Sequence, residues 1–209
     1  MSETSGSTPT TFTDFLRKKF KGIINPIAGF LNRLGIHPNA MTIAGLVGTA
    51  VGSYFLAIGQ ISLGGVIVLI AALFDAFDGS MARLRGEPSN FGGFVDSVSD
   101  RYAELFIFFG MLVYYLKLGD ATGCMLVFMA AGGSVMVSYV KARAEALGFE
   151  AKVGLLSRVE RYLVLGPCLV FNIPTVAMFI LAVFANGTAV QRIWHVRSQS
   201  LVERKNQKL

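Results

Sequence analysis

The chain has 209 residues, of which 53% are hydrophobic and only 15% are charged, and its mean hydropathy is +0.57. Soluble proteins have about a quarter of charged residues, so this composition excludes a soluble domain and indicates a single all-α integral membrane domain with short tails. The net charge of +6 could suggest nucleic acid, but the positions of the charges predict a membrane surface and no nucleic-acid partner.

The N-terminal segment divides into a polar tail and an amphipathic stretch. Residues 1–10 are polar, predict a disordered tail, and contain no apolar core of the kind found in a cleavable signal peptide. Residues 11–35 carry apolar side chains such as Ile23 and Phe30 on one face and basic side chains such as Arg33 on the other. This pattern predicts an interfacial amphipathic helix that lies in the headgroup plane.

Six apolar segments follow, and each is near the ~20 residues that cross the hydrocarbon core as a helix. Glycine, proline and asparagine separate these segments, which are placed at 41–59, 61–84, 93–116, 121–143, 157–173 and 174–194. The prediction is therefore an all-α membrane fold with six transmembrane helices after the amphipathic helix. The membrane domain covers residues 36–197, a cytoplasmic tail covers 198–209, and no internal repeat is evident.

The basic residues predict how these helices are oriented in the membrane. With the N-terminus inside, every Lys and Arg except Lys117 falls on the inner side of the predicted spans. Cytoplasmic loops of membrane proteins carry an excess of such residues. We therefore expect a multi-pass cell-membrane protein with both termini in the cytoplasm.

Four aspartates stand among otherwise apolar residues around the turn between the second and third spans. Asp75 and Asp78 are spaced i,i+3 and share one helix face, while Gly92, Asp96 and Asp100 are spaced i,i+4,i+8 on the next helix. A polar turn with glycine and proline separates the two helices. The arrangement predicts two carboxylate pairs that face each other at the cytoplasmic ends of these spans.

Carboxylates placed this close repel one another unless protons or cations neutralise them. Two divalent cations would balance the charge, and oxygen ligands suit Mg²⁺ best, with Mn²⁺ also suitable. Such a pair of ions can clamp a phosphate during a displacement. Gly79 and Ala82 leave room beside the carboxylates, and Arg83 adds a phosphate-binding fork.

Two other interpretations of the aspartates remain open at this point. The carboxylates could pair with arginines and hold helices together, or they could line a cation-transport path. A transporter places its ionisable groups near mid-membrane, often in broken helices related by repeats. Here the aspartates lie at the ends of their spans and no repeat is evident, so transport is the remote alternative.

The whole stretch matches the pattern Asp-x2-Asp-Gly-x2-Ala-Arg-x8-Gly-x3-Asp-x3-Asp at every fixed position. This pattern resembles the signature of the CDP-alcohol phosphotransferase family of integral membrane enzymes. The resemblance implies six transmembrane helices, a homodimer and a CDP-linked donor such as CDP-diacylglycerol. It also implies that Asp100 is the general base and that two metal ions are held by Asp75, Asp78, Asp96 and Asp100.

The donor site is implied by the same resemblance and by a Pro-Asn-x-x-Thr element before the first span. Helix capping alone would also explain Asn39, and both interpretations stay open. In the family, this element helps to bind the nucleotide. The implied donor-binding residues are Asn39, Thr42, Asp78, Gly79, Ala82, Arg83 and Gly92.

Basic residues also gather where the fourth span ends and the fifth begins. Any one of them could be only a positive-inside marker, and Lys141 could simply pair with Glu145 at i,i+4. As a group they would bind an anionic, water-soluble acceptor such as a sugar-alcohol phosphate. This region is similar to the family members that transfer to inositol phosphate in bacteria, and to their archaeal ether-lipid counterparts. The implied acceptor-binding residues are Lys141, Arg158, Arg161 and Arg192, with Arg197 in place of Arg192 as a further candidate.

The sequence therefore predicts a phospholipid synthase that acts on a membrane-lipid donor. It would transfer the phosphatidyl group from CDP-diacylglycerol to inositol 1-phosphate, as a phosphatidylinositol-phosphate synthase does, and release CMP. The alternatives are the same chemistry with glycerol 3-phosphate, as in a phosphatidylglycerophosphate synthase, or with an archaeal ether-lipid donor. A cation transporter remains the remote alternative.

Overall fold

The computed structural model describes residues 12–86 and 89–206, with side chains described for 22–86 and 89–205. The tail predicted at 1–10 lies outside these residues. In the described part of the chain there are only helices and no strands. The helices are α1 (Phe12–Arg33), α2 (Pro38–Ala57), α3 (Ile61–Arg85), α4 (Asn90–Leu118), α5 (Ala121–Ala146), α6 (Arg158–Val170) and α7 (Pro174–Asn206).

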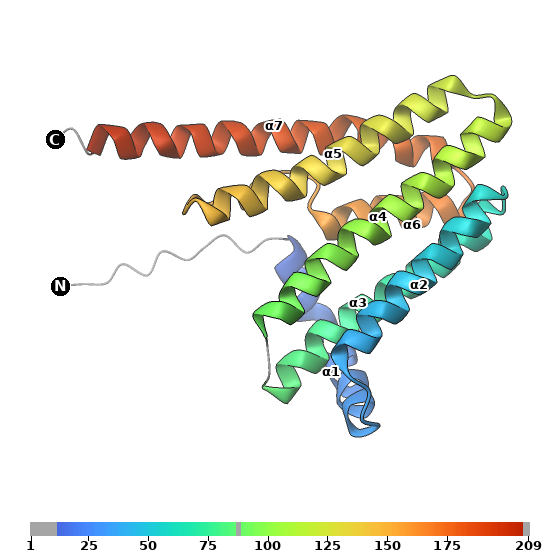
Figure 1. Cartoon of the computed structure of the whole chain (residues 1–209), viewed down its shortest axis with the longest axis horizontal. Helices are drawn as coiled ribbons and strands as arrows, with labels where there is room; N and C mark the ends of the chain where they lie inside the picture. Colours follow the sequence, from blue (N-terminus) through green and yellow to red (C-terminus); the bar gives the residue numbers. More distant parts are fainter. Residues whose placement is uncertain (1–11, 87–88, 207–209) are drawn as a thin grey trace.

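The helices form two groups that meet in the middle of the molecule (Figure 1). In the first group, α2 packs against both α3 and α4, and α1 packs against α3. In the second group, α5 packs along α7. Helix α6 joins the two groups because it contacts α3 on one side and α7 on the other, and α4 also contacts α5.

Close contacts of small residues fix α2 between its two neighbours. A Cβ atom added at Gly64 of α3 would lie 2.8 Å from the backbone oxygen of Gly52 in α2. One added at Gly110 of α4 would lie 2.5 Å from the backbone oxygen of Ser53. Membrane helices use small residues in this way because apolar lipid provides little hydrophobic force between them. The first group is therefore organised around α2, while α3 and α4 hardly touch each other.

The reversal between α3 and α4 is encoded by capping residues. Helix α3 ends at Gly86, whose φ of 69° is a left-handed conformation that favours glycine. Helix α4 begins after Ser89, whose side-chain oxygen accepts a hydrogen bond of 2.9 Å from the backbone N–H of Gly92. This turn places the last turns of α3 and the first turns of α4 at the same end of the molecule (Figure 1).

Helix α1 is anchored to that same end by apolar and polar contacts. Ala28 packs with Met41 and Met81 in a small buried cluster. The side-chain amide of Asn32 donates to the backbone oxygen of Met81 at 3.1 Å, and Arg85 donates to the Asn32 side-chain oxygen at 2.8 Å. Contacts with α1 therefore stabilise the end of α3 that carries the aspartates.

Four of the helices, α2, α3, α5 and α7, are long and apolar enough to cross a membrane. Helix α4 has 29 residues, but its first half carries Asp96, Asp100, Arg101 and Glu104. Helix α6 has 13 residues, a length of about 20 Å against a hydrocarbon core of about 30 Å. The helix is thus shorter than the span predicted at 157–173.

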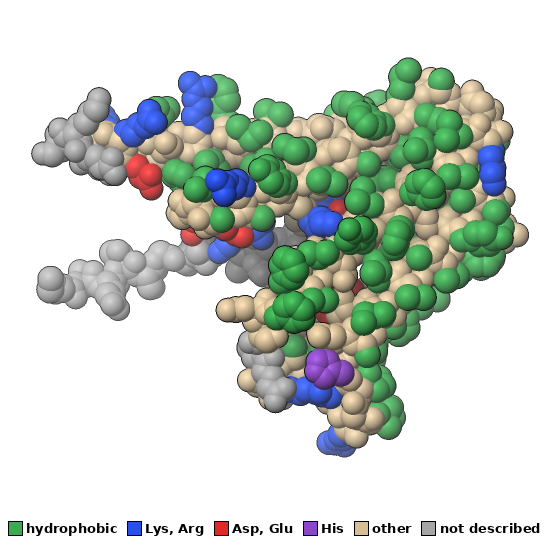
Figure 2. Space-filling view, in the orientation of Figure 1, with side chains coloured by type: hydrophobic (Ala, Val, Ile, Leu, Met, Phe, Trp, Pro, Cys, Tyr) green, Lys and Arg blue, Asp and Glu red, His purple; other side chains and the backbone are tan. Residues whose placement is uncertain are grey.

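The two ends of the predicted membrane domain also differ from expectation. Helix α1 stops at Arg33, because Leu34 and Gly35 form a turn in which Gly35 has a φ of +77°. Helix α7 continues beyond 194 to Asn206, so residues 198–206 of the predicted cytoplasmic tail are helical. Figure 2 shows hydrophobic side chains over most of the visible face, with most Lys and Arg toward the C-terminal ends of α5 and α7 and near α1.

Candidate metal and active site

Three aspartates from two helices come together beside the turn between α3 and α4. Asp75 and Asp78 lie on the last turns of α3, and Asp96 lies on the second turn of α4. One carboxylate oxygen from each lies within 4.8 Å of the other two. We refer to these three residues as the carboxylate cluster.

The donor set of this cluster fits a divalent cation. Three carboxylates offer only oxygen ligands, which Mg²⁺ and Mn²⁺ prefer, and their combined negative charge requires compensation. Asp78 is buried, whereas Asp75 and Asp96 are half-buried. Among the described residues, Asp78 and Asp96 form no ion pair with a lysine or arginine. The excess negative charge therefore sits at a place that an ion can reach.

The side chain of Asp78 is held by a hydrogen bond from α2. The hydroxyl of Thr42, on α2, donates a hydrogen bond of 2.6 Å to Asp78 Oδ2. A hydrogen bond to a charged acceptor is about twice as strong as a neutral one. The bond holds one carboxylate oxygen and leaves the other directed at its neighbours.

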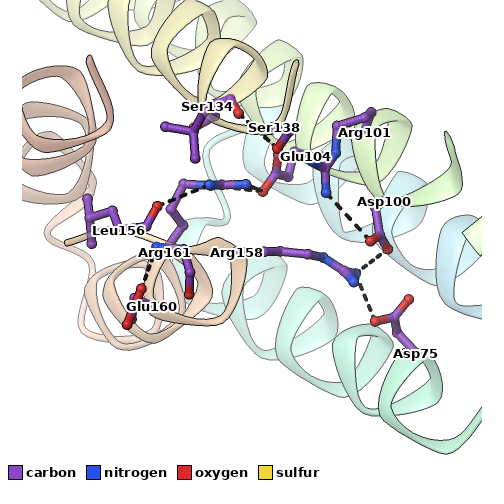
Figure 3. Close-up of polar contacts among 12 residues, drawn as sticks. Asp75, Asp100, Arg101, Glu104, Ser134, Ser138, Leu156, Arg158, Glu160 and Arg161 are labelled. Atoms are coloured by element: carbon purple, nitrogen blue, oxygen red, sulfur yellow. Dashed lines mark hydrogen bonds and ion pairs between the residues drawn. The ribbon is translucent and has the colours of Figure 1, made fainter. Parts of the chain in front are cut away.

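Asp100 lies one helical turn beyond Asp96 but has a different partner. Arg158, from α6, forms ion pairs with Asp100 and, at 2.8 Å, with Asp75 (Figure 3). Its guanidinium also lies 5.8 Å from the ring centroid of Tyr162. Asp100 is buried, and it does not belong to the group of three carboxylates. Arg158 thus connects the predicted base to the carboxylate cluster.

A further ion pair lies one more turn along α4. Glu104 Oε1 accepts hydrogen bonds from Arg161 Nε at 3.0 Å and from Arg161 Nη2 at 2.6 Å. The exposed fractions of Glu104 and Arg161 are 2% and 1%. The remaining nitrogen, Arg161 Nη1, donates to the backbone oxygen of Leu156 at 3.3 Å. This is the most deeply buried ion pair of the described chain.

Arg101 links the two ion pairs. Its Nη2 lies 3.5 Å from Asp100 Oδ2, and its Nε lies 3.9 Å from Glu104 Oε2. Five side chains of alternating charge therefore form a row between α6 and α4 (Figure 3). We call this row the ion ladder, and it consists of Arg158, Asp100, Arg101, Glu104 and Arg161.

Sequence reasoning missed Glu104. Its spacing of four residues from Asp100 continues the stripe of Asp96 and Asp100 along the helix, and it stands among apolar residues. Those two features were signals that could have identified it. Its partner is 57 residues away, so the pairing itself could not be seen.

A small cavity lies between α2, α3, α4 and α6. Thr42, Asp75, Asp100, Arg158 and Tyr162 are among the residues that line it. A reacting group placed in this cavity would contact the carboxylates of both Asp75 and Asp100. The cavity is therefore the point where the carboxylate cluster and the ion ladder meet.

The other residues of the predicted donor site surround the end of α3. Asn39 lies on the first turn of α2, and its backbone N–H donates to His37 Nδ1 at 3.3 Å. Ala82 is half-buried, and a Cβ atom added at Gly79 would meet only the Arg83 side chain, at 3.4 Å. Arg83 is exposed and donates to the Ser80 hydroxyl at 2.9 Å. The expected open space beside the cluster is present.

Gly92 has a local role as well as a place near the cluster. Its backbone N–H is the donor that caps α4 on Ser89. A Cβ atom added at Gly92 would lie 3.0 Å from the Ser89 side-chain oxygen, which is a close contact. The side chain at this position must be small for the cap to form.

The four predicted acceptor residues come from α5, α6 and α7, and each already has a partner in this structure. Lys141 is half-buried and pairs with Glu145 at 3.8 Å, and Arg158 lies in the ion ladder. Arg161 is closed to solvent and held by Glu104. Its role in acceptor binding stays a prediction.

The side chain of Arg192 is also buried, and its guanidinium donates hydrogen bonds to two backbone oxygens. Its Nε donates to the backbone oxygen of Val153 at 2.8 Å and its Nη1 donates to that of Val137 at 2.7 Å. These bonds tie the loop after α5 to both α5 and α7. The exposed fraction of Arg192 is 6%, and its role in acceptor binding stays a prediction. Arg197, its substitute in the prediction, is exposed and stacks on Trp194.

Comparison with known sequences identifies relatives over almost the whole chain. The family model described as CDP-alcohol phosphatidyltransferase matches residues 35–198. A phosphatidylinositol phosphate synthase of Mycobacteroides abscessus is 36% identical over 193 residues, covering 87% of each chain. An archaetidylinositol phosphate synthase of Pyrococcus horikoshii is 34% identical over 185 residues, covering 88% of this chain and 96% of that protein.

Comparison with solved structures gives the same result. The phosphatidylinositol phosphate synthase of Mycobacterium tuberculosis, in complex with manganese and citrate, matches with a TM-score of 0.77 and 31% identity. That match covers 83% of this chain and 88% of the other. The same protein with CDP-DAG bound matches with a TM-score of 0.74 and 32% identity, covering 83% and 93%.

Proposed function

This chain belongs to the CDP-alcohol phosphatidyltransferase family, and we propose that it is a membrane enzyme that transfers the phosphatidyl group of CDP-diacylglycerol to inositol 1-phosphate. The products are phosphatidylinositol phosphate and CMP. The relatives with 34% and 36% identity are named archaetidylinositol phosphate synthase and phosphatidylinositol phosphate synthase, which supports an inositol phosphate as the acceptor. The M. tuberculosis structure with CDP-DAG bound supports the donor.

The observation that carries the proposal is the carboxylate cluster. Asp75, Asp78 and Asp96 would hold divalent cations, with Asp100 shared between metal binding and proton transfer. Two Mg²⁺ or Mn²⁺ ions bound there supply positive charge to the donor pyrophosphate and to the leaving CMP. The manganese complex of the M. tuberculosis protein supports this choice of metal.

The chain's own residues bind and orient the donor around this cluster. Thr42 holds Asp78 in place, so the carboxylate does not have to reorganise when the pyrophosphate arrives. Gly79 and Ala82 leave space for the cytidine, and Arg83 contacts a donor phosphate. Asn39 and Gly92 complete the donor site from the first turns of α2 and α4.

Asp100 acts as the general base from the wall of the cavity. Its carboxylate takes the proton from the acceptor hydroxyl. The hydroxyl oxygen forms a bond to the phosphorus that carries the lipid, and the bond between this phosphorus and the CMP oxygen breaks. Arg158 holds the Asp100 carboxylate by an ion pair and keeps it directed at the cavity.

The acceptor phosphate is bound by the basic residues that a ligand can reach. Lys141 and Arg158 are the predicted acceptor residues with partly exposed side chains, at 44% and 27%. Arg161 adds a further positive charge to this site and is held in place by Glu104. Arg192 supports it by holding the loop at Val153.

We also propose how the protein lies in the membrane. Residues 36–197 form the catalytic membrane domain, in which α4 and the short α6 cross together with the four apolar helices. Helix α1 lies in the interface, because Ile23 and Phe30 on it are 63% and 60% exposed. The positions of the basic residues place both termini and the aspartates on the cytoplasmic side. The protein works as a homodimer, as the family resemblance implies.

An archaeal ether-lipid donor is the second candidate substrate, because one of the relatives is named as an archaetidylinositol phosphate synthase. The carboxylate cluster contacts the pyrophosphate and not the lipid tails, so it serves either donor equally. The two donors differ only in the apolar chains that lie in the membrane. Parallel assays with ester and ether CDP-lipids would distinguish them.

The direct test is CMP release by the purified protein in detergent with CDP-diacylglycerol and Mg²⁺. Inositol 1-phosphate, glycerol 3-phosphate, free inositol and serine are compared as acceptors. We expect CMP release with inositol 1-phosphate alone. Release with glycerol 3-phosphate instead would overturn the acceptor assignment. No release with any acceptor and either donor, from folded protein, would overturn the proposed function.

A matched pair of variants shows whether the activity belongs to the proposed site. Asp100→Asn should abolish CMP release while the protein still folds and binds the CDP-lipid. The control is Asp120→Asn, at the start of α5, where Asp120 Oδ1 accepts a hydrogen bond from the Gly123 N–H at 2.9 Å. Asparagine caps a helix equally well, so this control should keep full activity. Normal turnover by Asp100→Asn would exclude the general-base role.

A further inference from the structure

The first turn of α6 is connected to α4 by side chains rather than by backbone packing. The two helices do not pack closely along their length. Arg158 and Arg161 reach from α6 to Asp100 and Glu104 of α4 (Figure 3). These two arginines are therefore the ionic links between α6 and α4, while α3 and α7 pack against α6 along its length.

Arg161 and Arg158 are three residues apart, so they lie one turn apart on the same face of α6. Arg161 is the more firmly held of the two, because Glu104 accepts two of its hydrogen bonds and Leu156 a third. A helix anchored at one residue has little freedom one turn away. The position of Arg161 thus determines where the Arg158 guanidinium can reach.

The charge of Glu104 also controls which carboxylate each arginine selects. Without that charge, Arg161 would be a buried cation with no counter-ion, which is strongly unfavourable. The next carboxylate along α4 is Asp100, one turn away. Arg161 and Arg101 would then compete with Arg158 for Asp100. Glu104 prevents this competition. Its Oε1 accepts a hydrogen bond from Arg161, and its Oε2 lies 3.9 Å from Arg101 Nε.

We infer that Glu104 is a positioning residue for the transfer reaction: it anchors Arg161, and through the first turn of α6 it places Arg158 between Asp75 and Asp100. Glu104 is 2% exposed, so it does not contact the substrate itself. The inference rests on the proposed function, since it assigns Glu104 to the support of that same site. It concerns how the site is aligned, not which acceptor it takes.

The test separates alignment from stability with a double-mutant cycle. Glu104→Met and Arg161→Met are made singly and together, and Glu104→Gln is made as a further single variant. Each single variant removes the closest counter-ion of a buried charge, so its Tm should fall. The double variant replaces the pair with apolar side chains of similar volume, and such replacements of buried ion pairs are often neutral or stabilising. Its Tm should return to near that of the wild type.

Activity should not follow the Tm in this cycle. Loss of a residue that orients a ligand typically lowers activity or metal affinity by about 10- to 100-fold. We expect kcat to fall by that factor in the single variants and to stay low in the double variant, with the KM for the donor unchanged. Glu104→Asp should recover part of the kcat. Recovery of wild-type kcat in the double variant would mean that the pair only stabilises the fold, and would overturn the inference.

Mn²⁺ binding, measured by electron paramagnetic resonance, gives a readout that needs no substrate. Misplacement of Arg158 should change the Mn²⁺ affinity of the Glu104→Gln variant by about tenfold, because Arg158 contacts Asp75. The matched control is Glu145→Gln, which breaks the exposed pair with Lys141 and should leave Mn²⁺ affinity and Tm unchanged. Glu104→Gln with wild-type Mn²⁺ affinity and wild-type kcat would overturn the inference. Absence of CMP release by the wild type would instead count against the proposed function. The Mn²⁺ affinities of the variants could still be compared in that case.

Discussion

The carboxylate cluster and the ion ladder lie side by side and are built from the same kinds of residue, yet their charges are arranged in opposite ways. In the cluster, three carboxylates converge and share a single arginine, at Asp75. In the ladder, each carboxylate lies between two arginines. Uncompensated negative charge requires cations from outside, whereas alternating charge holds helices in register. The difference separates carboxylates that lack a basic partner from carboxylates that are paired.

This comparison predicts opposite effects on stability when a charge is removed. Asp78→Asn removes one of three converging carboxylates and should abolish CMP release, since the cations lose a ligand. The Tm measured in EDTA should stay the same or rise, because less charge repels in the cluster. Both are measured on one preparation, by CMP release and by thermal unfolding in detergent. A large fall of Tm in EDTA would mean that Asp78 is a structural residue instead.

At the Glu104–Arg161 end of the ladder, removal of a charge should also lower stability. Arg161→Met leaves the buried Glu104 with only the contact of 3.9 Å to Arg101, and the expected loss is about 3–5 kcal/mol of unfolding free energy. Reversible chemical denaturation in mixed micelles measures this loss against the wild type. A loss of less than about 1 kcal/mol, the value typical of exposed pairs, would show that the ladder is not a buried ionic network.

A smaller effect is expected where α2 contacts the carboxylate cluster. Thr42→Val keeps the shape of the side chain but removes the hydrogen bond of 2.6 Å to Asp78. Hydrogen bonds to charged groups contribute about 1.5–3 kcal/mol, and the loss should appear as weaker Mn²⁺ binding and a higher KM for the donor. Steady-state kinetics with varied CDP-diacylglycerol measures this. Ser198→Ala is the control, because the Ser198 hydroxyl donates to the backbone oxygen of Trp194 within α7.

The smallest effect is expected at the exposed pair of Lys141 and Glu145. Their side chains are 44% and 46% exposed and 3.8 Å apart, so Glu145→Gln should change the unfolding free energy by less than about 1 kcal/mol. Lys141→Gln should also leave stability unchanged but raise the KM for inositol 1-phosphate. An unchanged KM for the acceptor in Lys141→Gln would remove Lys141 from the acceptor site.

Much of the cluster could be predicted from spacing alone. The intervals between Asp75 and Asp78 and between Asp96 and Asp100 place their carboxylates on one face of each helix, and the turn between them is marked by glycine. The structure brings Asp75, Asp78 and Asp96 together as that spacing indicates. Local periodicity was sufficient because the residues are near one another in the chain.

The acceptor side could not be predicted in the same way. Arg158, Arg161 and Arg192 all stand near the ends of apolar segments, and from sequence a buried arginine looks the same as an exposed one there. Their partners Glu104, Val137 and Val153 come from distant parts of the chain. Which arginines are open to a ligand depends on these long-range contacts. The short length of α6 was hidden for a similar reason, since its neighbouring residues are as apolar as the helix itself.

The most direct test of the account is the Mn²⁺ stoichiometry of the purified protein, measured by electron paramagnetic resonance. The account predicts two bound ions per chain in the wild type, with at least one lost in both Asp78→Asn and Asp96→Asn and none lost in Asp120→Asn. The absence of bound Mn²⁺ in the wild type, or wild-type binding in both cluster variants, would contradict the claim that the uncompensated carboxylates form the metal site.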